Sequence, residues 1–285
     1  MPPRLRYRRR RDALRRRHGD RRAIVSIEAL GWRTDVSLRR LEGAAVEEHE
    51  HHWVIRTPAN PSYWWGNFLL LRSPLRTGEA ESWVGRFRAS FPAASHVAIG
   101  IDSPSGEVGA SGELPAAGLS LDVDAVLTAD ALRAPERTPP RTEFRRLQGD
   151  RDWAQAMGLR IRTAEDQEGP AYREFLAREM RAIRAVCERD HGAWFGAFQD
   201  GEMRSSLGVF RASEGVARFQ SVDTLPEHRR QGLASSLLFV ASEWARSELR
   251  AGTLVIVADP DHFAIELYRS LGFRDHEHKV CLSRV

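Results

Sequence analysis

The sequence contains almost no lysine, little cysteine and no long apolar run. Lys279 is the only lysine among 285 residues, so nearly every basic side chain is an arginine, which we interpret as coding bias. The two cysteines, Cys187 and Cys281, are too few and too far apart for a disulfide framework, and they favour a reducing, cytoplasmic compartment. No apolar stretch approaches the ~20 residues that a membrane span needs, so we expect no membrane partner.

Positive charge is concentrated at the N-terminus. Residues 1–22 hold 11 Arg against two Asp, a net charge of +9, whereas the whole chain carries +4. The remaining residues are therefore mildly acidic, with a net charge of −5. Blocks of like charge are usually disordered, and some bind nucleic acid. We predict a disordered basic arm at 1–22, and the acidic body disfavours nucleic acid as a partner.

The length and composition predict two domains. A chain of 285 residues exceeds one small domain, and its hydrophobic content of 42% allows a sizeable core. The prolines of the segment 133–140 fix φ and remove backbone donors, so neither a helix nor an inner strand continues through it. We therefore expect a linker at 136–140, between one domain at 23–135 and another at 141–285.

Hydrophobic periodicity and turn signals predict the elements of the C-terminal half. Apolar residues recur at helical spacing over 172–187, and a second helix begins near Gly232. Asp261 is a suitable N-cap for a third helix, and Gly272 fits the position just after its end. Short apolar runs between turns predict strands at 143–147, 193–199, 203–211, 216–225, 253–258, 273–278 and 280–284.

The N-terminal half gives a shorter version of the same order. It shows one helical pattern at 80–91 and strand patterns at 52–57, 67–72, 96–101 and 119–127. No clean sequence repeat relates the two halves. The element order predicts an α/β (α+β) fold with a mixed, mostly antiparallel central sheet flanked by helices.

The segment 222–234 carries the clearest chemical signal. A strand ends at Pro226, and a loop rich in donors leads into the helix near Gly232. The N-terminus of a helix has free N–H groups and the positive end of the macrodipole, so it can bind phosphate. Gly232 allows close approach of a ligand, and Arg229 and Arg230 add charge that suits a pyrophosphate. Neither a P-loop nor a dinucleotide fingerprint is present, and the alternative is an ordinary strand–loop–helix turn with surface arginines.

The same residues resemble the signature of a known family. Arg229-Arg230-Gln231-Gly232-Leu233-Ala234 is similar to the acyl-CoA signature Arg/Gln-x-x-Gly-x-Gly/Ala of the GNAT N-acetyltransferases. The segment 261–273 resembles that family's Asn-x-x-Ala-x-x-x-Tyr-x-x-x-Gly-Phe, with Asp261 in place of Asn and with Tyr268 intact. The resemblance covers about 141–285 and implies the GNAT fold for this half.

The resemblance also implies a co-substrate and its contacts. In this family the loop amides hold the pyrophosphate of acetyl-CoA, and main-chain groups of the preceding strand contact its pantetheine and acetyl carbonyl. Tyr268 matches the residue that protonates the departing thiolate. The implied cofactor-binding residues are Val222, Asp223, Thr224, Arg229, Arg230, Gln231, Gly232, Leu233, Ala234, Ser235 and Asp261.

The segment 56–68 of the N-terminal half resembles a stretch found in some tandem GNAT proteins. This implies a smaller GNAT-like α/β domain at 23–135. Because no acyl-CoA signature occurs there, we expect this domain not to bind CoA. We expect it to wall the acceptor pocket or to form a subunit contact, for example in a homodimer.

The general base and a metal site are less clearly indicated. Asp223, on the strand before the loop, is the best candidate for the base; Glu179, His191 and a chain of waters are alternatives. The His/Glu clusters at 47–52 and 276–278 lack zinc-binding spacing, so we interpret them as polar turns and expect no metal.

These features favour one function over another of a different class. The first is acetyl-CoA-dependent N-acetylation of a primary amine of a small molecule or peptide, by direct attack. The second is a non-catalytic module of the GNAT fold that binds and senses acyl-CoA. The intact Gly232, Ala234 and Tyr268 favour the enzyme.

Overall fold

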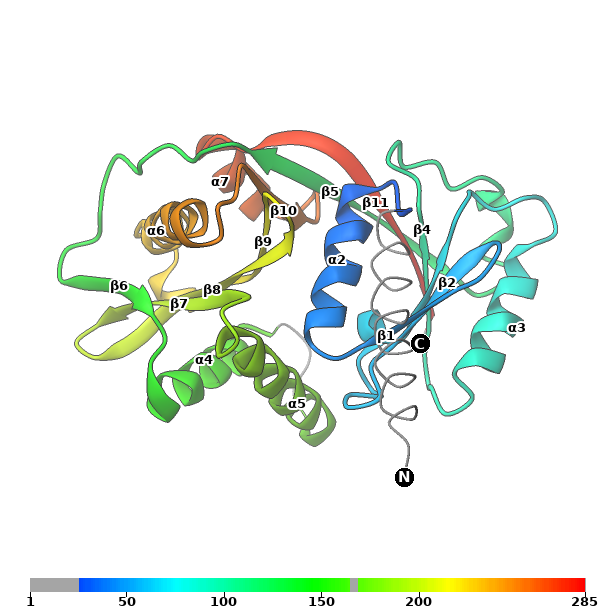
Figure 1. The fold of residues 1–285 in the computed structure, drawn as a ribbon, viewed down its shortest axis with the longest axis horizontal. Helices are drawn as coiled ribbons and strands as arrows, with labels where there is room; N and C mark the ends of the chain where they lie inside the picture. Colours follow the sequence, from blue (N-terminus) through cyan, green and yellow to red (C-terminus); the bar gives the residue numbers. More distant parts are fainter. Residues whose placement is uncertain (1–25, 165–168, 285) are drawn as a thin grey trace, which may run out of the picture.

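The computed structural model describes residues 26–164 and 169–284, and its backbone is organised around one 11-stranded sheet (Figure 1). The basic arm predicted at 1–22 lies outside the described residues. The strands are β1 Ala45–Glu48, β2 His52–Arg56, β3 Phe68–Leu71, β4 Val97–Ile101, β5 Ser120–Ala129, β6 Thr142–Arg146, β7 Gly192–Gln199, β8 Glu202–Ser213, β9 Val216–Thr224, β10 Thr253–Ala258 and β11 Arg274–Arg284. The described α-helices are α2 Leu30–Leu41, α3 Ala80–Ser90, α4 Gly149–Thr163, α5 Pro170–Cys187, α6 Leu233–Glu248 and α7 Ala264–Ser270.

The strand order shows that the two halves of the chain share the sheet. It runs β1-β2-β3-β4-β11-β5-β10-β9-β8-β7-β6, and only the pairs β3/β4 and β9/β10 are parallel. The prediction of a mixed, mostly antiparallel sheet is confirmed. The last strand of each half lies beside the other half: β5 pairs with β10, and β11 pairs with β4. Strands β5 and β11 also pair with each other along nearly their whole length.

Alternate residues of β7 separate the two faces of the C-terminal half of the sheet. Phe195 packs in a core with α6 and α7 on one face. Trp194 points to the opposite face and packs in a second core with α4 and α5. Leu38 from α2 belongs to this second core, so a helix from the N-terminal half covers part of the C-terminal sheet (Figure 1). The opposite side of α2, with Trp32 and Val36, belongs to the core of the N-terminal half.

Buried ion pairs fix α2 against the shared strands. The Asp35 carboxylate lies 3.2 Å from Arg218 Nη2 on β9 and 2.7 Å from Nζ of Lys279, the sole lysine, on β11. Burial by itself would raise the pKa of Asp35, but Lys279 and Arg218 outweigh it and lower that pKa to about 2. Buried charges persist in proteins when they are paired in this way. The pairs therefore link α2 to strands from the C-terminal half.

Three details of the sequence prediction were wrong. The strands predicted at 273–278 and 280–284 are one strand, β11, with a register irregularity between Asp275 and Glu277. Asp261 does not cap the third helix, because α7 begins at Ala264 and has no side-chain cap. The two His/Glu clusters predicted as polar turns contain strand residues: the cluster at 47–52 overlaps the edge strand β1, whose Glu47 and Glu48 are exposed, and the cluster at 276–278 lies within β11.

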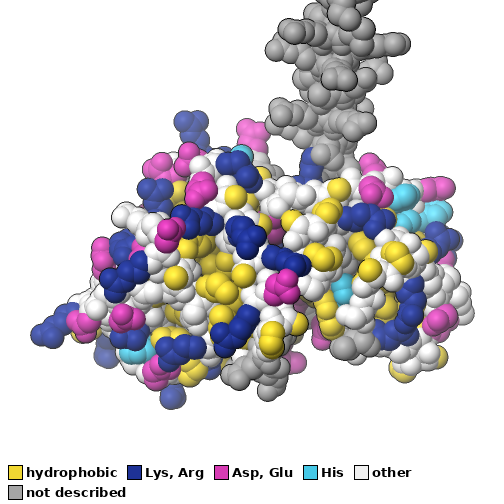
Figure 2. Space-filling view, turned by 90° about the horizontal axis from the view of Figure 1, so that it is seen from below, with side chains coloured by type: hydrophobic (Ala, Val, Ile, Leu, Met, Phe, Trp, Pro, Cys, Tyr) yellow, Lys and Arg dark blue, Asp and Glu magenta, His cyan; other side chains and the backbone are white. Residues whose placement is uncertain are grey.

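Basic and acidic side chains are mixed on the face of the molecule drawn in Figure 2. Figure 2 shows Lys and Arg interspersed with Asp and Glu over the described part of one face, with apolar side chains between them. None of the described helices is both long and apolar enough to cross a membrane.

Candidate active site

The parallel strands β9 and β10 pair over only part of their length. Their register ends with Leu254 opposite Ala217 and Val255 opposite Arg218. Beyond this point β9 contains a bulge: Gly208 of β8 faces Gln220, whereas Ser206 faces Asp223. Ser221 accordingly has a positive φ of 50°. Because a bulge re-aims the residues that follow it, the end of β9 turns toward a cavity.

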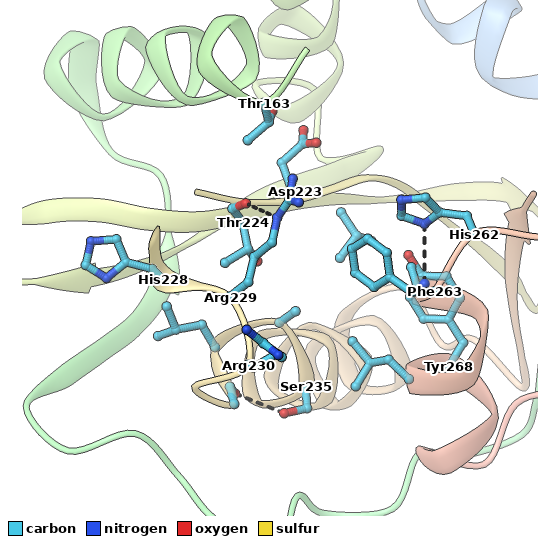
Figure 3. A pocket seen from close by; sticks show the side chains of 16 residues that line it. Thr163, Asp223, Thr224, His228, Arg229, Arg230, Ser235, His262, Phe263 and Tyr268 are labelled. Atoms are coloured by element: carbon cyan, nitrogen blue, oxygen red, sulfur yellow. Dashed lines mark hydrogen bonds between the residues drawn. The ribbon is translucent and has the colours of Figure 1, made fainter. Parts of the chain in front are cut away.

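This cavity has a volume of about 450 Å³ and draws its walls from several elements. Figure 3 shows the end of β9 above the N-terminus of α6, with α7 on one side and the end of α4 beyond the strand. The lining residues are Thr163, Val222, Asp223, Thr224, His228, Arg229, Arg230, Gly232, Leu233, Ala234, Ser235, His262, Phe263, Ala264, Leu267 and Tyr268. The cavity therefore extends from the loop before α6 to the opposite face of the sheet, where α4 lies.

The N-terminus of α6 presents main-chain donors to this cavity. Gly232 has a φ of 81°, which glycine adopts without the steric cost that other residues meet, and no side chain caps the helix. The Ser235 hydroxyl donates to Gly232 O at 2.9 Å, so it does not block the helix end. Arg229 Nε donates to Thr224 O at 3.4 Å. This arrangement can bind an anionic group such as a phosphate.

Tyr268 on α7 brings a proton donor to the other end of the same cavity. Its side chain is 6% exposed, and its ring packs edge-on against Phe273 with centroids 6.3 Å apart. Burial, with a smaller contribution from the Asp223 charge, raises the pKa of Tyr268 well above its ordinary value. The phenol is therefore protonated at neutral pH. Figure 3 shows its hydroxyl directed toward the cavity.

Asp223 brings a carboxylate to the α4 side of the cavity. Its Oδ2 lies 3.8 Å from Arg160 Nε, and its side chain is 25% exposed. Burial raises the pKa of Asp223, while Arg160 and a hydrogen bond with Thr163 partly oppose this rise. A carboxylate with a raised pKa is a better proton acceptor than a fully solvated one.

Most of the predicted site residues meet at this cavity, but four lie elsewhere. Gln231 donates to Glu227 O at 3.3 Å, and its side chain does not line the cavity. Asp261 is exposed, and its N–H donates to Asp259 Oδ1 at 2.8 Å. Glu179 lies behind Arg160, and His191 lies at the turn before β7.

Six lining residues were not predicted as site residues from the sequence: Thr163, His228, His262, Phe263, Ala264 and Leu267. His262 Nδ1 accepts the N–H of Ala264 at 3.3 Å, and Phe263 is 64% exposed at the cavity. Both lie between the matched positions of the second signature, and their proximity to Asp261 is the signal that was available. Thr163 ends a helix for which no range was predicted.

The N-terminal half has a comparable strand–loop–helix, in which a carboxylate of the chain binds the loop just before the helix. The N–H of Gly78, just before α3, donates to both carboxylate oxygens of Glu113 at 2.8 and 2.9 Å. The Glu113 carboxylate thus lies against the loop that precedes α3, whereas α3 itself, like α6, has no side-chain cap. The neighbouring strands β3 and β4 are paired up to Leu71 and Ile101. That the N-terminal half does not bind CoA stays a prediction.

The segment 56–68 lies against α5. Asn60 Nδ2 donates to the carbonyl of Phe175 at 3.1 Å, and the Tyr63 and Phe175 rings are 5.2 Å apart.

The residues described by the structure contain no group of three or more His, Cys, Asp or Glu arranged to hold a metal ion.

Comparison with known proteins decides the family. Residues 159–273 match the family described as "Acetyltransferase (GNAT) family". The C-terminal half of this chain is a GNAT domain. The matched range contains the α6 loop, Asp223 and Tyr268, so the predicted relationship is confirmed on the residues that suggested it.

Solved structures share the GNAT fold over most of the chain. A functionally unknown conserved protein from Staphylococcus epidermidis is 11% identical with a TM-score of 0.67, covering 85% of this chain and 94% of that one. A GCN5-related N-acetyltransferase from Kribbella flavida is 16% identical with a TM-score of 0.61, covering 88% and 95%.

A tandem GNAT protein from the clavulanic acid biosynthesis pathway is 15% identical with a TM-score of 0.53, covering 93% of this chain and 95% of that one. At these identities the likeness shows the fold alone. No curated protein matches the sequence significantly.

Proposed function

We propose that this protein transfers the acetyl group of acetyl-CoA to a primary amine of a small molecule or peptide. The observation that carries the proposal is that one cavity joins the uncapped N-terminus of α6, the Tyr268 phenol and the Asp223 carboxylate. An anion site, a proton donor and a proton acceptor in one cavity suit attack of an amine on a thioester. The GNAT family match supports acyl transfer in general.

The α6 loop would hold the co-substrate. Main-chain donors at Gly232 to Ser235, with Arg229 and Arg230 beside them, suit the pyrophosphate of CoA. The rest of the molecule then runs along the end of β9, where Ser221 and Val222 together stand opposite the single Leu207 of β8. A bulge leaves its extra residue unpaired, and main-chain groups freed in this way would hold pantetheine and the acetyl carbonyl. Donors near that carbonyl stabilise the negative charge that develops on its oxygen.

Asp223 and Tyr268 would handle the protons. The attacking amine must be a free base, and Asp223 faces the α4 side, from which the acceptor enters in this proposal. The carboxylate accepts the proton lost by the amine, directly or through water. Tyr268 donates its proton to the thiolate of CoA as the bond between sulfur and the acetyl carbon breaks. The segment 56–68, packed on α5, forms part of the acceptor wall in this account.

The test is acetyl-CoA-dependent thiol release by the full chain with a panel of small amines, amino acids and peptides. We expect release with at least one amine, together with a monoacetylated product detected by mass spectrometry. Tight acetyl-CoA binding without thiol release from any amine would contradict the proposal and favour the non-catalytic sensing module.

A further inference from the structure

Arg160 on α4 lies between two carboxylates that come from different elements. Its Nη1 is 2.7 Å from Glu179 Oε2 on α5, and its Nε is 3.8 Å from Asp223 Oδ2 on β9. The Arg160 and Glu179 side chains are 14% and 8% exposed. Of the three, only Asp223 lines the cavity. In Figure 3 the Asp223 carboxylate points away from the α6 loop and toward Thr163, at the end of the helix that carries Arg160.

We propose that Arg160 and Glu179 are positioning residues that hold Asp223 in place as the carboxylate facing the acceptor amine. This inference rests on the proposed function, because it assigns the second layer of that same site. Neither Arg160 nor Glu179 touches the substrates in this account, and both act through Asp223.

The packing of Arg160 explains why it can fix the Asp223 side chain. Its guanidinium lies 6.0 Å from the centroid of the Trp194 ring, and its Nη1 is 3.8 Å from the sulfur of Met180. These neighbours belong to the buried core under α4 and α5. Glu179 orients one edge of the guanidinium by a charge-assisted hydrogen bond. The Nε edge is then left facing Asp223.

Arg160 and Glu179 carry opposite charges, so they shift the pKa of Asp223 in opposite directions. Arg160 favours the ionised carboxylate, whereas Glu179 disfavours it. The other polar groups facing Asp223 are the Thr163 hydroxyl from α4, Tyr172 from α5, Arg229 from the loop before α6 and Tyr268 from α7. Tyr172 also interacts with Arg160 and Glu179, but burial raises the pKa of Tyr172 above its ordinary value, so its phenol stays uncharged at neutral and acid pH.

The experiment is the pH profile of kcat/KM for the acceptor, measured by thiol release with the full chain. The acid limb, which is the fall in kcat/KM toward low pH, should reflect protonation of the Asp223 carboxylate. In Arg160→Gln this limb should move up by about one pH unit, since a neighbouring charge shifts a carboxyl pKa by one or more units. In Glu179→Gln, which keeps the shape and an acceptor for Arg160, the limb should move down. Arg160→Lys should restore part of the wild-type position, and KM for acetyl-CoA should stay within about twofold in each variant.

Matched controls lie on the same helices. Arg151→Gln on α4 and Glu174→Gln on α5 remove exposed charges, whose partners are Glu202 and Arg178. Neither should move the limb. In an Asp223→Asn background, changing Arg160 should no longer shift it.

The outcomes separate the two proposals. Limbs that move in opposite directions in the two Gln variants support the positioning role. If both folded Gln variants turn over but their acid limbs do not move, or move in the same direction as each other, this inference is overturned and the proposed function stays intact. Absence of turnover by the wild-type chain with every amine overturns the proposed function, and this inference with it. Circular dichroism identifies any Arg160→Gln protein that has not folded, and Glu179→Gln then decides.

Discussion

Replacing Tyr268 with Phe removes one hydroxyl from the cavity and leaves the packing of α7 intact. The ring is buried against Phe273 and belongs to the core shared with α6. Among the described residues the hydroxyl forms no hydrogen bond, and in Figure 3 it faces the cavity. Its loss should therefore change the free energy of unfolding by less than about 1 kcal/mol, the net contribution of one ordinary hydrogen bond.

The effect on turnover should be much larger. A positioned general acid contributes roughly 10²- to 10⁴-fold, so kcat for Tyr268→Phe should fall by about 10²-fold or more, equivalent to about 3 kcal/mol of transition-state stabilisation. Because the raised pKa of Tyr268 keeps the phenol protonated, the wild-type rate should show no basic limb from this group below about pH 10. Acetyl-CoA affinity should be nearly unchanged, since the α6 loop is untouched.

Thiol release gives kcat, calorimetry gives acetyl-CoA affinity, and urea unfolding gives stability. Ser242→Ala is the matched control, because it removes a buried hydroxyl on α6 that does not line the cavity; its turnover should stay near that of the wild type. Unchanged turnover and affinity in Tyr268→Phe would remove the phenol from the mechanism. Weaker acetyl-CoA binding with unchanged kcat would give it a binding role instead.

Three further predictions concern the loop, a buried carboxyl and the shared sheet. Gly232→Glu should abolish acetyl-CoA binding by calorimetry, whereas Gly201→Glu, at a hairpin glycine of similar φ outside the cavity, should not; equal binding by both variants would argue against the α6 site. Burial raises the pKa of Glu42 to about 7, above its ordinary 4.5. The protonated carboxyl therefore stabilises the folded state at low pH, and this stabilisation is lost as the pH rises through 7. Between about pH 5 and about pH 8, the free energy of unfolding of the wild type, measured with urea, should fall by up to roughly 3 kcal/mol relative to that of Glu42→Gln. Parallel pH dependence of the two proteins would refute this. A 141–285 fragment should fail to fold alone, since it lacks β5, and should regain its circular dichroism when co-expressed with 1–140. A folded, monomeric fragment would contradict the arrangement in which β5 and β11 each pair with a strand of the other half.

The local elements of the C-terminal half were predictable because their signals are local. The helix α6 has apolar residues at regular spacing and a glycine at its start. The strands β7 to β9 are short apolar runs between turns. The cavity residues on the loop could be predicted for the same reason, since the loop and its helix are contiguous in sequence.

Helix α2 was not predicted, because its buried face is partly polar. Thr34 and Arg39 are buried, and Asp35 is paired with cations from β9 and β11. Those partners lie nearly two hundred residues or more further along the chain, so no local pattern shows that the charges are neutralised. The helix consequently lacks the clean apolar stripe that marks an amphipathic helix.

No local pattern could predict that β5 and β11 each pair with a strand of the other half. Both strands look like ordinary final strands of their own halves. Which neighbour they pair with depends on long-range register, such as Val280 opposite Val123 and Ile101. The same limit applies to Thr163, which reaches the cavity only because α4 packs across the end of β9.

The most direct test of the central claim is a crystal structure of the full chain with acetyl-CoA. The account predicts one bound molecule per chain, in the C-terminal half. Its pyrophosphate should lie on the amides of residues 232–235 and its thioester between the end of β9 and the Tyr268 hydroxyl. A pyrophosphate bound at α3 of the N-terminal half, or a thioester remote from both Tyr268 and Asp223, would contradict it.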